Sequence, residues 1–495
     1  MTSLRSWLIQ NDFHLDPRLQ LTGPPLHVIA TAPIPPHSTL ARIPKDTVLS
    51  HRTSSLARAA PVAAASLDTA SPPLRLAVHV LHEVLLGAQS RWATYLEHCP
   101  VETVPIALLW DDDGEARRWV RGTQLERELR RLGVSRSSLS AFFHSSVLPL
   151  LAPLTALSSL PPPTIAAFLH AYSLVSSRAF QVDTYHTLAL VPLADAFDHS
   201  SPPHVHFASD VWVCAECGAL DECAHDREDE SKPSEPERGG ATATGGPERQ
   251  TCDMVATDLP IVPGEEVFNH YGYLSSARLL AEYGFALEAN EHDRVGFGSA
   301  ELRGLLREEE DEWVWEEVER MTRDDWVRRE AEEEEHPLLA SSAPTEEAAS
   351  SEPVYFDADA KLSPALWLLL ARTALVSELR SGSDDPVSCS SRIDHLAALL
   401  ARFASDEERE DVPLGLDGRD AQALSRIARV VRQLCDTRLR GQHRPELSGA
   451  GVLELAETIE DEQLKRAMEF TAGERLVLER VRENWTAVAR LASGI

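Results

Sequence analysis

The feature that most constrains the fold is a segment of glycine turns and aromatic residues, GEEVFNHYGYLSSARLLAEYGFALEANEHDRVGF, at residues 264–297. It places Tyr271 beside a glycine, and a second triplet, Tyr283-Gly284-Phe285, follows a short stretch with the apolar spacing of a helix. Upstream, residues 188–200 read LALVPLADAFDHS. These two segments, in this order, are the strongest indication of fold in the chain.

Together they resemble the paired C-terminal motifs of SET-domain methyltransferases, in the branch related to the Rubisco large-subunit lysine methyltransferase. The resemblance covers about residues 5–300 in ordered pieces. It implies an α+β fold: a SET-domain β core of small sheets with a pseudoknot, a helical insert, and an all-α C-terminal domain. It also implies an S-adenosylmethionine-dependent protein-lysine N-methyltransferase that acts on a non-histone protein. A ribosomal protein or a translation factor is the first candidate substrate.

The pattern along the chain predicts four parts. Residues 1–60 read as strands and turns, because short β-branched runs alternate with prolines, and form the N-terminal part of the core. Apolar residues at helical spacing predict a helical insert over 61–175. Residues 176–300 form the C-terminal part of the core, with a cysteine-rich insertion at 210–253. Residues 301–495 form a helical domain similar in class to the family's substrate-binding domain.

Two segments, 226–251 and 331–353, are predicted to be disordered, because they are poor in large apolar residues. Between them, an acidic stretch with Trp313 and Trp326 is a helix candidate with a solvated charged face. From about residue 362, apolar stripes predict successive helices. Thr471, with Glu474 three residues later, has the form of a capping box at the start of the last helix.

The net charge of −31, from 47 Lys and Arg against 78 Asp and Glu, argues against nucleic acid or an anionic membrane as the main partner. It suits a basic protein substrate, although an acidic surface also serves solubility alone. No secretory or membrane-spanning segment is recognised, which predicts a protein of the cytoplasm or nucleus. The sequence does not predict the oligomeric state.

Lysine methylation needs a neutral amine, yet a free lysine has a pKa of about 10.4, so an apolar aromatic channel favours the reaction. The resemblance assigns the catalytic tyrosine to Tyr271, whose hydroxyl also lies near the cofactor. It assigns the substrate channel to Phe268, Tyr283 and Phe285. The plain alternative for each aromatic residue is ordinary core packing.

The cofactor half of the site maps, by the same resemblance, onto Ser177, Arg178, Asp195, Asp198 and His199, together with the catalytic tyrosine. The guanidinium of Arg178 would pair with the cofactor carboxylate. Its plain alternative is a partner of the helix dipole at a C-terminus. Asp195 would brace the turn, and His199 would lie against the cofactor.

Two departures from the family pattern bear on cofactor binding. The family has Asn-His where this chain has Asp198-His199, which loses an amide donor and adds a negative charge. The family's Gly-x-Gly turn is replaced by GPPLHV at residues 23–28, and proline or leucine cannot substitute for glycine where φ is positive. Both departures favour an alternative reading, a weak or inactive SET-fold scaffold.

Four of the seven cysteines fall in or beside the insertion. Cys214, Cys217 and Cys223 are the better candidates for a structural zinc site, and His225 and Cys252 compete for the fourth position. Free thiols on a surface loop are the plain alternative. A zinc-organised loop that recruits a partner, and histidine rather than lysine as the methylated residue, also remain open.

Overall fold

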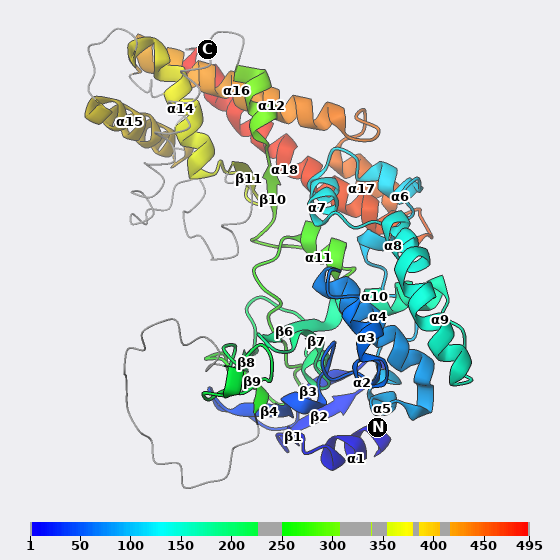
Figure 1. Ribbon diagram of the computed structural model, residues 1–495. Helices are drawn as coiled ribbons and strands as arrows, with labels where there is room; N and C mark the ends of the chain where they lie inside the picture. The colour runs from blue at the N-terminus through cyan, green and yellow to red at the C-terminus, as the bar shows by residue number, and fades with distance from the viewer. Residues whose placement is uncertain are drawn as a thin grey trace. The chain divides into compact units, whose positions relative to one another are not determined.

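The computed structural model describes residues 2–225, 250–306, 338, 354–379, 386–405 and 416–493 (Figure 1). The chain forms two compact units. The first comprises Met1–Leu109, Ser135–Tyr271 and Glu282–Gly284, and the second comprises Trp110–Val134, Gly272–Ala281 and Phe285–Ile495. Small sheets and many helices confirm the predicted α+β class. The pseudoknot stays a prediction.

Three small antiparallel sheets form the β part of the first unit. The four-stranded sheet has the order β1 (His14–Leu15), β4 (Thr39–Pro44), β9 (Thr251–Ala256), β8 (Val205–Ser209). The three-stranded sheet has the order β5 (Leu49–Ser50), β7 (Thr187–Leu190), β6 (Ala179–Asp183). The third sheet pairs β2 (Leu19–Thr22) with β3 (His27–Ala30). Sheets of such short strands are not stable alone and depend on packing against the rest of the unit.

The core of this unit contains both motif segments. Side chains alternate between buried and half-buried along β9, as expected for a strand with one face on a core. Val28 of β3, Phe197 and Val267 are fully buried in the same cluster as Leu40 and Ile43 of β4. Packing of the two segments against the N-terminal strands therefore fixes the backbone from which the candidate site residues project.

Helices make up the remainder of the first unit. α4 begins with two prolines, in the first turn where a missing N–H costs no helical hydrogen bond, and Gly87, with a φ of 52°, follows its last residue. The helix packs against α10. The helices are α1 (Thr2–Gln10), α2 (Ser55–Ala59), α3 (Pro61–Ala65), α4 (Pro72–Leu86), α5 (Ala93–Leu96), α8 (Arg136–Phe142), α9 (Leu148–Leu157) and α10 (Ile165–Arg178). Short helical turns are η1 (Lys45–Thr47), η2 (Gly87–Gln89), η3 (Ala107–Leu109), η4 (Phe143–Val147) and η5 (Ala194–Ala196).

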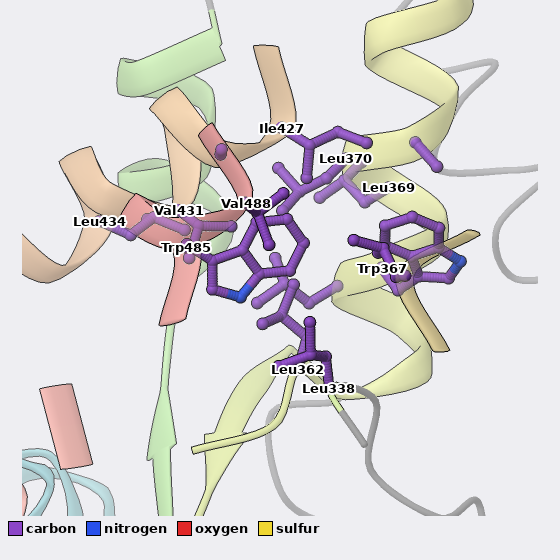
Figure 2. Packing of buried hydrophobic residues seen from close by; sticks show 14 of the residues in the cluster. Leu338, Leu362, Trp367, Leu369, Leu370, Ile427, Val431, Leu434, Trp485 and Val488 are labelled. Atoms are coloured by element: carbon purple, nitrogen blue, oxygen red, sulfur yellow. The ribbon is translucent and has the colours of Figure 1, made fainter. Parts of the chain in front are cut away.

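The second unit is mostly helical and has its own apolar core. Trp367 of α14 and Trp485 of α18 are buried there with Ile427 and Val431 of α16 (Figure 2). Its helices are α6 (Glu115–Trp119), α7 (Gln124–Leu132), α11 (Ser276–Glu282), α12 (Ser299–Leu306), α14 (Pro364–Leu379), α15 (Pro386–Ser405), α16 (Gly418–Gly441), α17 (Gly449–Ala456) and α18 (Glu462–Ala492). The last residue of α11, Glu282, is grouped with the first unit.

Two predictions about the C-terminal region are wrong. The region is not all-α, because β11 (Tyr355–Asp357) pairs with β10 (Arg294–Gly296). Thr471 does not cap a helix, since α18 begins at Glu462 behind the N-cap Asp461 and runs through Thr471. The Thr471 hydroxyl instead donates to the Ala467 carbonyl at 2.8 Å within the helix.

The predicted disordered segments lie largely outside the described residues, as does the acidic stretch with Trp313 and Trp326. Three described residues are exceptions. Gln250 and Thr251, expected in the first disordered segment, lie immediately before and at the start of β9, and Leu338, expected in the second, is buried in the apolar core of the second unit.

One stretch, residues 124–157, is long and apolar enough to cross a membrane by length and composition alone. Gly133, with a left-handed φ of 65°, ends α7, and Ser135 caps the N-terminus of α8. The stretch is therefore interrupted by a turn in this structure.

Candidate functional site

The two motif segments lie side by side in the first unit. The Asn269 N–H donates to the Asp198 carbonyl at 2.7 Å, and the Ser200 N–H donates to the Asn269 carbonyl at 3.0 Å. On its other side, the downstream segment bonds to β3 through the Val267 N–H and the Val28 carbonyl at 2.8 Å. Three chain segments far apart in sequence thus meet at one place.

Tyr271 is stacked between two aromatic rings. Its ring centroid lies 5.1 Å from that of His199, at 27°, and 5.0 Å from that of Tyr283, at 25°. The Tyr271 N–H donates to His199 Nδ1 at 3.1 Å, so the proton of a neutral His199 ring resides on Nε2. The structure therefore brings three predicted site residues together.

The Tyr271 hydroxyl donates to the Phe197 carbonyl at 3.3 Å, which places two oxygen atoms next to each other at the end of the ring stack. Burial is the main cause that raises the pKa of Tyr271 well above its ordinary value, with the Asp198 carboxylate adding to it. Tyr271 is therefore a neutral phenol at physiological pH. It can orient and donate, but it does not serve as a base.

The glycine between the two channel aromatics has a defined backbone role. Gly284 has a φ of 84°, and a Cβ atom added there would lie 3.1 Å from the Pro105 carbonyl carbon. A larger residue would strain the turn and push it away from residue 105. Tyr283 owes its position beside Tyr271 in part to this close approach.

Arg178 ends α10 and faces the turn at Asp195. Its Nη1 donates to the Asp195 carbonyl at 2.8 Å and lies 3.6 Å from Asp195 Oδ2, which also accepts from the Tyr95 hydroxyl at 2.7 Å. Burial raises the pKa of Asp195, while the guanidinium opposes that shift. Asp195 thus braces the turn, as predicted, through Arg178 and Tyr95.

Three buried polar groups of the site have atoms without a hydrogen-bond partner among the described residues. They are Arg178 Nε, Asp195 Oδ1 and both amide atoms of Asn269, a residue that is 1% exposed. Buried polar atoms usually find partners, so such groups fit a polar ligand. A guanidinium and a primary amide are suited to a carboxylate and an ammonium group, as S-adenosylmethionine carries.

Asn269 was not among the predicted site residues. Its position within the motif, two residues before Tyr271, was the available signal. Ser177, by contrast, was predicted at the cofactor, but its hydroxyl donates to the Ser173 carbonyl at 2.8 Å inside α10. The structure gives that hydroxyl a role in the helix.

Asp198 forms an unexpected cluster with residues from two other segments. His27 Nδ1 lies 3.2 Å from Asp198 Oδ2 and 2.9 Å from Glu266 Oε1. Burial raises the pKa of Asp198, and the nearby His27 and Arg178 partly offset this. His27, in the stretch that replaces the family's glycine turn, is therefore in direct contact with Asp198, the other departure from the family pattern.

Two further channel candidates are Phe268 and Phe285. The Phe268 ring stacks on His204, with centroids 5.9 Å apart, and the Phe268 N–H donates to His204 Nδ1 at 3.2 Å. Phe285 belongs to the second unit and is half-buried there. The aromatic stack around Tyr271 in the first unit thus contains Tyr283 and His199.

The cysteine-rich insertion holds a second cluster. The potential ligand atoms of Cys214, Cys217, Cys223 and His225 all lie within 4.8 Å of one another. Backbone N–H groups of Cys217 and Glu216 are the main cause that lowers the pKa of the Cys214 thiol to about 7. His225, rather than Cys252, is the fourth member.

Cys252 does not join this group, and its assignment as a metal ligand is wrong. It lies on β9 with its side chain fully buried, and burial raises the pKa of its thiol to about 12. The alternation of Cys252, Met254 and Ala256 on one face of the strand turns all three into the core. That alternation is visible in the sequence and was the missed signal.

The sequence of the chain was compared with protein-family models and with curated proteins. No family model matches the chain. Ribosomal lysine N-methyltransferase 3 of Saccharomyces cerevisiae is 34% identical over 176 residues, which cover 28% of this chain and 32% of that protein. The chain thus matches about a third of the length of this curated relative.

Solved structures match over nearly the whole chain. The SET domain of LSMT bound to lysine and AdoHcy has a TM-score of 0.54 at 16% identity, covering 100% of this chain and 92% of that one. Rubisco LSMT bound to AdoMet has a TM-score of 0.53 at 16% identity, covering 100% and 93%. The predicted resemblance is confirmed in the fold, and this chain has the SET-domain fold of those structures.

Proposed function

We propose that the protein is an S-adenosylmethionine-dependent protein-lysine N-methyltransferase whose substrate is a ribosomal protein. The observation that carries this proposal is the position of Tyr271. Its neutral hydroxyl bonds to the Phe197 carbonyl, and its ring is stacked between His199 and Tyr283. The names of the relative and of the structural neighbours, all lysine methyltransferases or their complexes, support the same reaction.

Bound S-adenosylmethionine supplies an electrophilic methyl group. Arg178, through its unpartnered Nε, and Asn269, through its unpartnered amide, would hold the carboxylate and ammonium ends. The aromatic faces of Tyr271 and Tyr283 lower the polarity around an entering lysine and so favour its neutral amine. Phe285 stays a proposed channel residue.

The two oxygen atoms at Tyr271 and Phe197 would orient the reacting amine. Aligning two bound groups before reaction can be worth on the order of 7–11 kcal/mol of the barrier, so positioning is a sufficient role for these residues. Tyr271 cannot take the lysine proton, because the pKa of its phenol is raised. In this proposal the lysine loses its proton to an acceptor other than Tyr271, such as water, before the methyl group is transferred.

The substrate proposal rests on the yeast relative, whose name specifies a ribosomal target, and on charge. A net charge of −31 favours encounter with basic proteins such as those of the ribosome. For location we propose the cytoplasm or the nucleus, where Cys214, Cys217 and Cys223, which form no disulfide in this structure, would stay reduced.

The proposal is tested by incubating the full chain with labelled S-adenosylmethionine and separated ribosomal proteins, followed by mass spectrometry of the labelled bands. Methyl-lysine in one ribosomal protein is the expected result. Label on histidine, or on a protein outside the ribosome, would overturn the substrate assignment. Absence of both labelling and cofactor binding would favour the scaffold alternative, for which the His27–Asp198 contact is the structural argument.

A further inference from the structure

The insertion cluster has the dimensions of a zinc site. His225 Nδ1 lies 3.7 Å from Cys214 Sγ and 3.5 Å from Cys223 Sγ. Tetrahedral zinc has bonds of about 2.3 Å to sulfur and 2.0–2.1 Å to nitrogen, so its sulfur and nitrogen ligands are about 3.5–3.6 Å apart. Both measured distances match an edge of such a tetrahedron. The Cys217 sulfur completes the set within 4.8 Å of the others.

The backbone around Cys214 and Cys217 forms a tight turn that aims both sulfurs at one point. The Gly218 N–H donates to the Cys214 carbonyl at 2.8 Å, and the Cys214 N–H donates to the Ala219 carbonyl at 2.8 Å. Gly218 has a φ of 74°, and a Cβ atom there would lie 3.1 Å from the Tyr185 ring. The turn is thus shaped for two cysteines three residues apart and fits closely against Tyr185.

This turn is fastened to the β core at several points. Arg52 Nη2 donates to the Ala215 carbonyl at 3.1 Å, and its guanidinium lies 5.1 Å from the centre of the Tyr185 ring. The Val213 N–H donates to the Thr184 hydroxyl at 3.3 Å. Gln250 Nε2, next to the start of β9, donates to the Gly218 carbonyl at 2.9 Å. The cluster therefore lies where the insertion leaves the core and where it returns.

We propose that Cys214, Cys217, Cys223 and His225 bind one structural zinc ion that fixes the base of the insertion to the turn between β6 and β7. Three thiolates and one imidazole form a closed tetrahedral set, which leaves no open position for substrate. Sulfur-rich coordination favours zinc over magnesium or calcium. The three thiolates give the site a net negative charge, which the Arg52 guanidinium beside Ala215 partly offsets.

The test measures zinc in the full chain after dialysis against metal-free, reducing buffer. The wild type is expected to retain about one zinc per chain, and Cys217→Ser and His225→Ala to lose it. Cys252→Ser is the matched control, because Cys252 is a cysteine of the same region outside the group, and it should keep its zinc. A zinc-free wild type, or loss in Cys252→Ser with retention in His225→Ala, would overturn the proposal.

Two further readouts separate metal loss from misfolding. The cobalt-substituted wild type should show thiolate-to-cobalt charge transfer, and Cys217→Ser and His225→Ala, which are expected to lose the metal, should lack it while Cys252→Ser keeps it. A strong chelator should lower the melting temperature of the wild type and leave that of Cys217→Ser unchanged. A disulfide among these cysteines, detected by alkylating the denatured chain before any reduction, would also contradict the site. None of these measurements depends on methyl transfer.

Discussion

His27 Nδ1 lies 3.2 Å from Asp198 Oδ2, so a residue of the stretch that replaces the family's glycine turn contacts the residue in place of its asparagine. Glu266, just ahead of the motif that holds Tyr271, shares the same histidine at 2.9 Å. One histidine therefore lies between two carboxylates, at the place where the two departures from the family pattern meet. It ties β3 to both motif segments.

This contact predicts energetic coupling between His27 and Asp198. The His27 side chain is 35% exposed and that of Asp198 is 42% exposed. Solvent screening therefore limits the coupling between them to about 0.2–1 kcal/mol. Denaturant unfolding of His27→Gln, Asp198→Asn and the double variant, in mild acid and low salt, should give that coupling and lose much of it in high salt. The more exposed pair His37–Asp258 is the control. Strict additivity at low salt would contradict the contact.

Arg178→Lys should weaken S-adenosylmethionine binding. Lysine keeps the charge but loses the planar fork, including the buried Nε that has no partner among the described residues. Loss of one charge-assisted hydrogen bond predicts a Kd increase of about 10- to 100-fold by calorimetry. Arg18→Lys, in an ion pair with Asp16 in the same unit, should leave the Kd unchanged. An unaltered Kd in a folded Arg178→Lys protein would remove Arg178 from the cofactor site.

The buried pair Lys45–Asp183 should be a major contributor to the stability of the first unit. Lys45 Nζ lies 2.9 Å from Asp183 Oδ2, and the two side chains are 4% and 0% exposed. Lys45→Met removes the lysine ammonium from a buried carboxylate that keeps its bonds to His186, and should lower the free energy of unfolding by about 3 kcal/mol. Arg42→Met, which breaks the exposed Arg42–Asp253 pair, should cost under about 1 kcal/mol. Equal effects of the two substitutions would contradict this account.

The second unit should carry a pH dependence from Asp293. Burial raises the pKa of this carboxyl from 3.8 to about 6, although it accepts a hydrogen bond from the Ser276 N–H. The folded state therefore binds the extra proton, and the free energy of unfolding should fall as pH rises from about 4 to about 6, by up to about 3 kcal/mol. Asp293→Asn keeps an acceptor for Ser276 and should remove this slope. The same slope in the variant would exclude Asp293 as its source.

The parts of the site that follow from the sequence are those encoded in short contiguous motifs. Tyr271, Tyr283 and His199 could be assigned because each sits at a fixed place in one of two linear segments, and the structure stacks all three. The α+β class follows in the same way from proline-rich short strands and long apolar stripes. Local pattern was sufficient in each case.

Contacts between distant segments could not be predicted in this way. Tyr95 reaches Asp195 across 100 residues, and His27 reaches Glu266 across 239, because these bonds depend on how the sheets pack. A helix start is also ambiguous when the apolar stripe continues upstream. Thr471 has a capping pattern, yet α18 extends through it because Asp461 supplies the cap for residues 463 and 464.

The most direct test of the central claim compares single-turnover methyl transfer by the wild type and Tyr271→Phe at saturating S-adenosylmethionine. Phenylalanine keeps the stacking on His199 and Tyr283 but loses the hydrogen bond to the Phe197 carbonyl. The expected result is a rate lower by about 10²–10³-fold with nearly unchanged cofactor affinity, as for loss of one preorganised donor. Equal rates for the two proteins would contradict the assigned role of Tyr271.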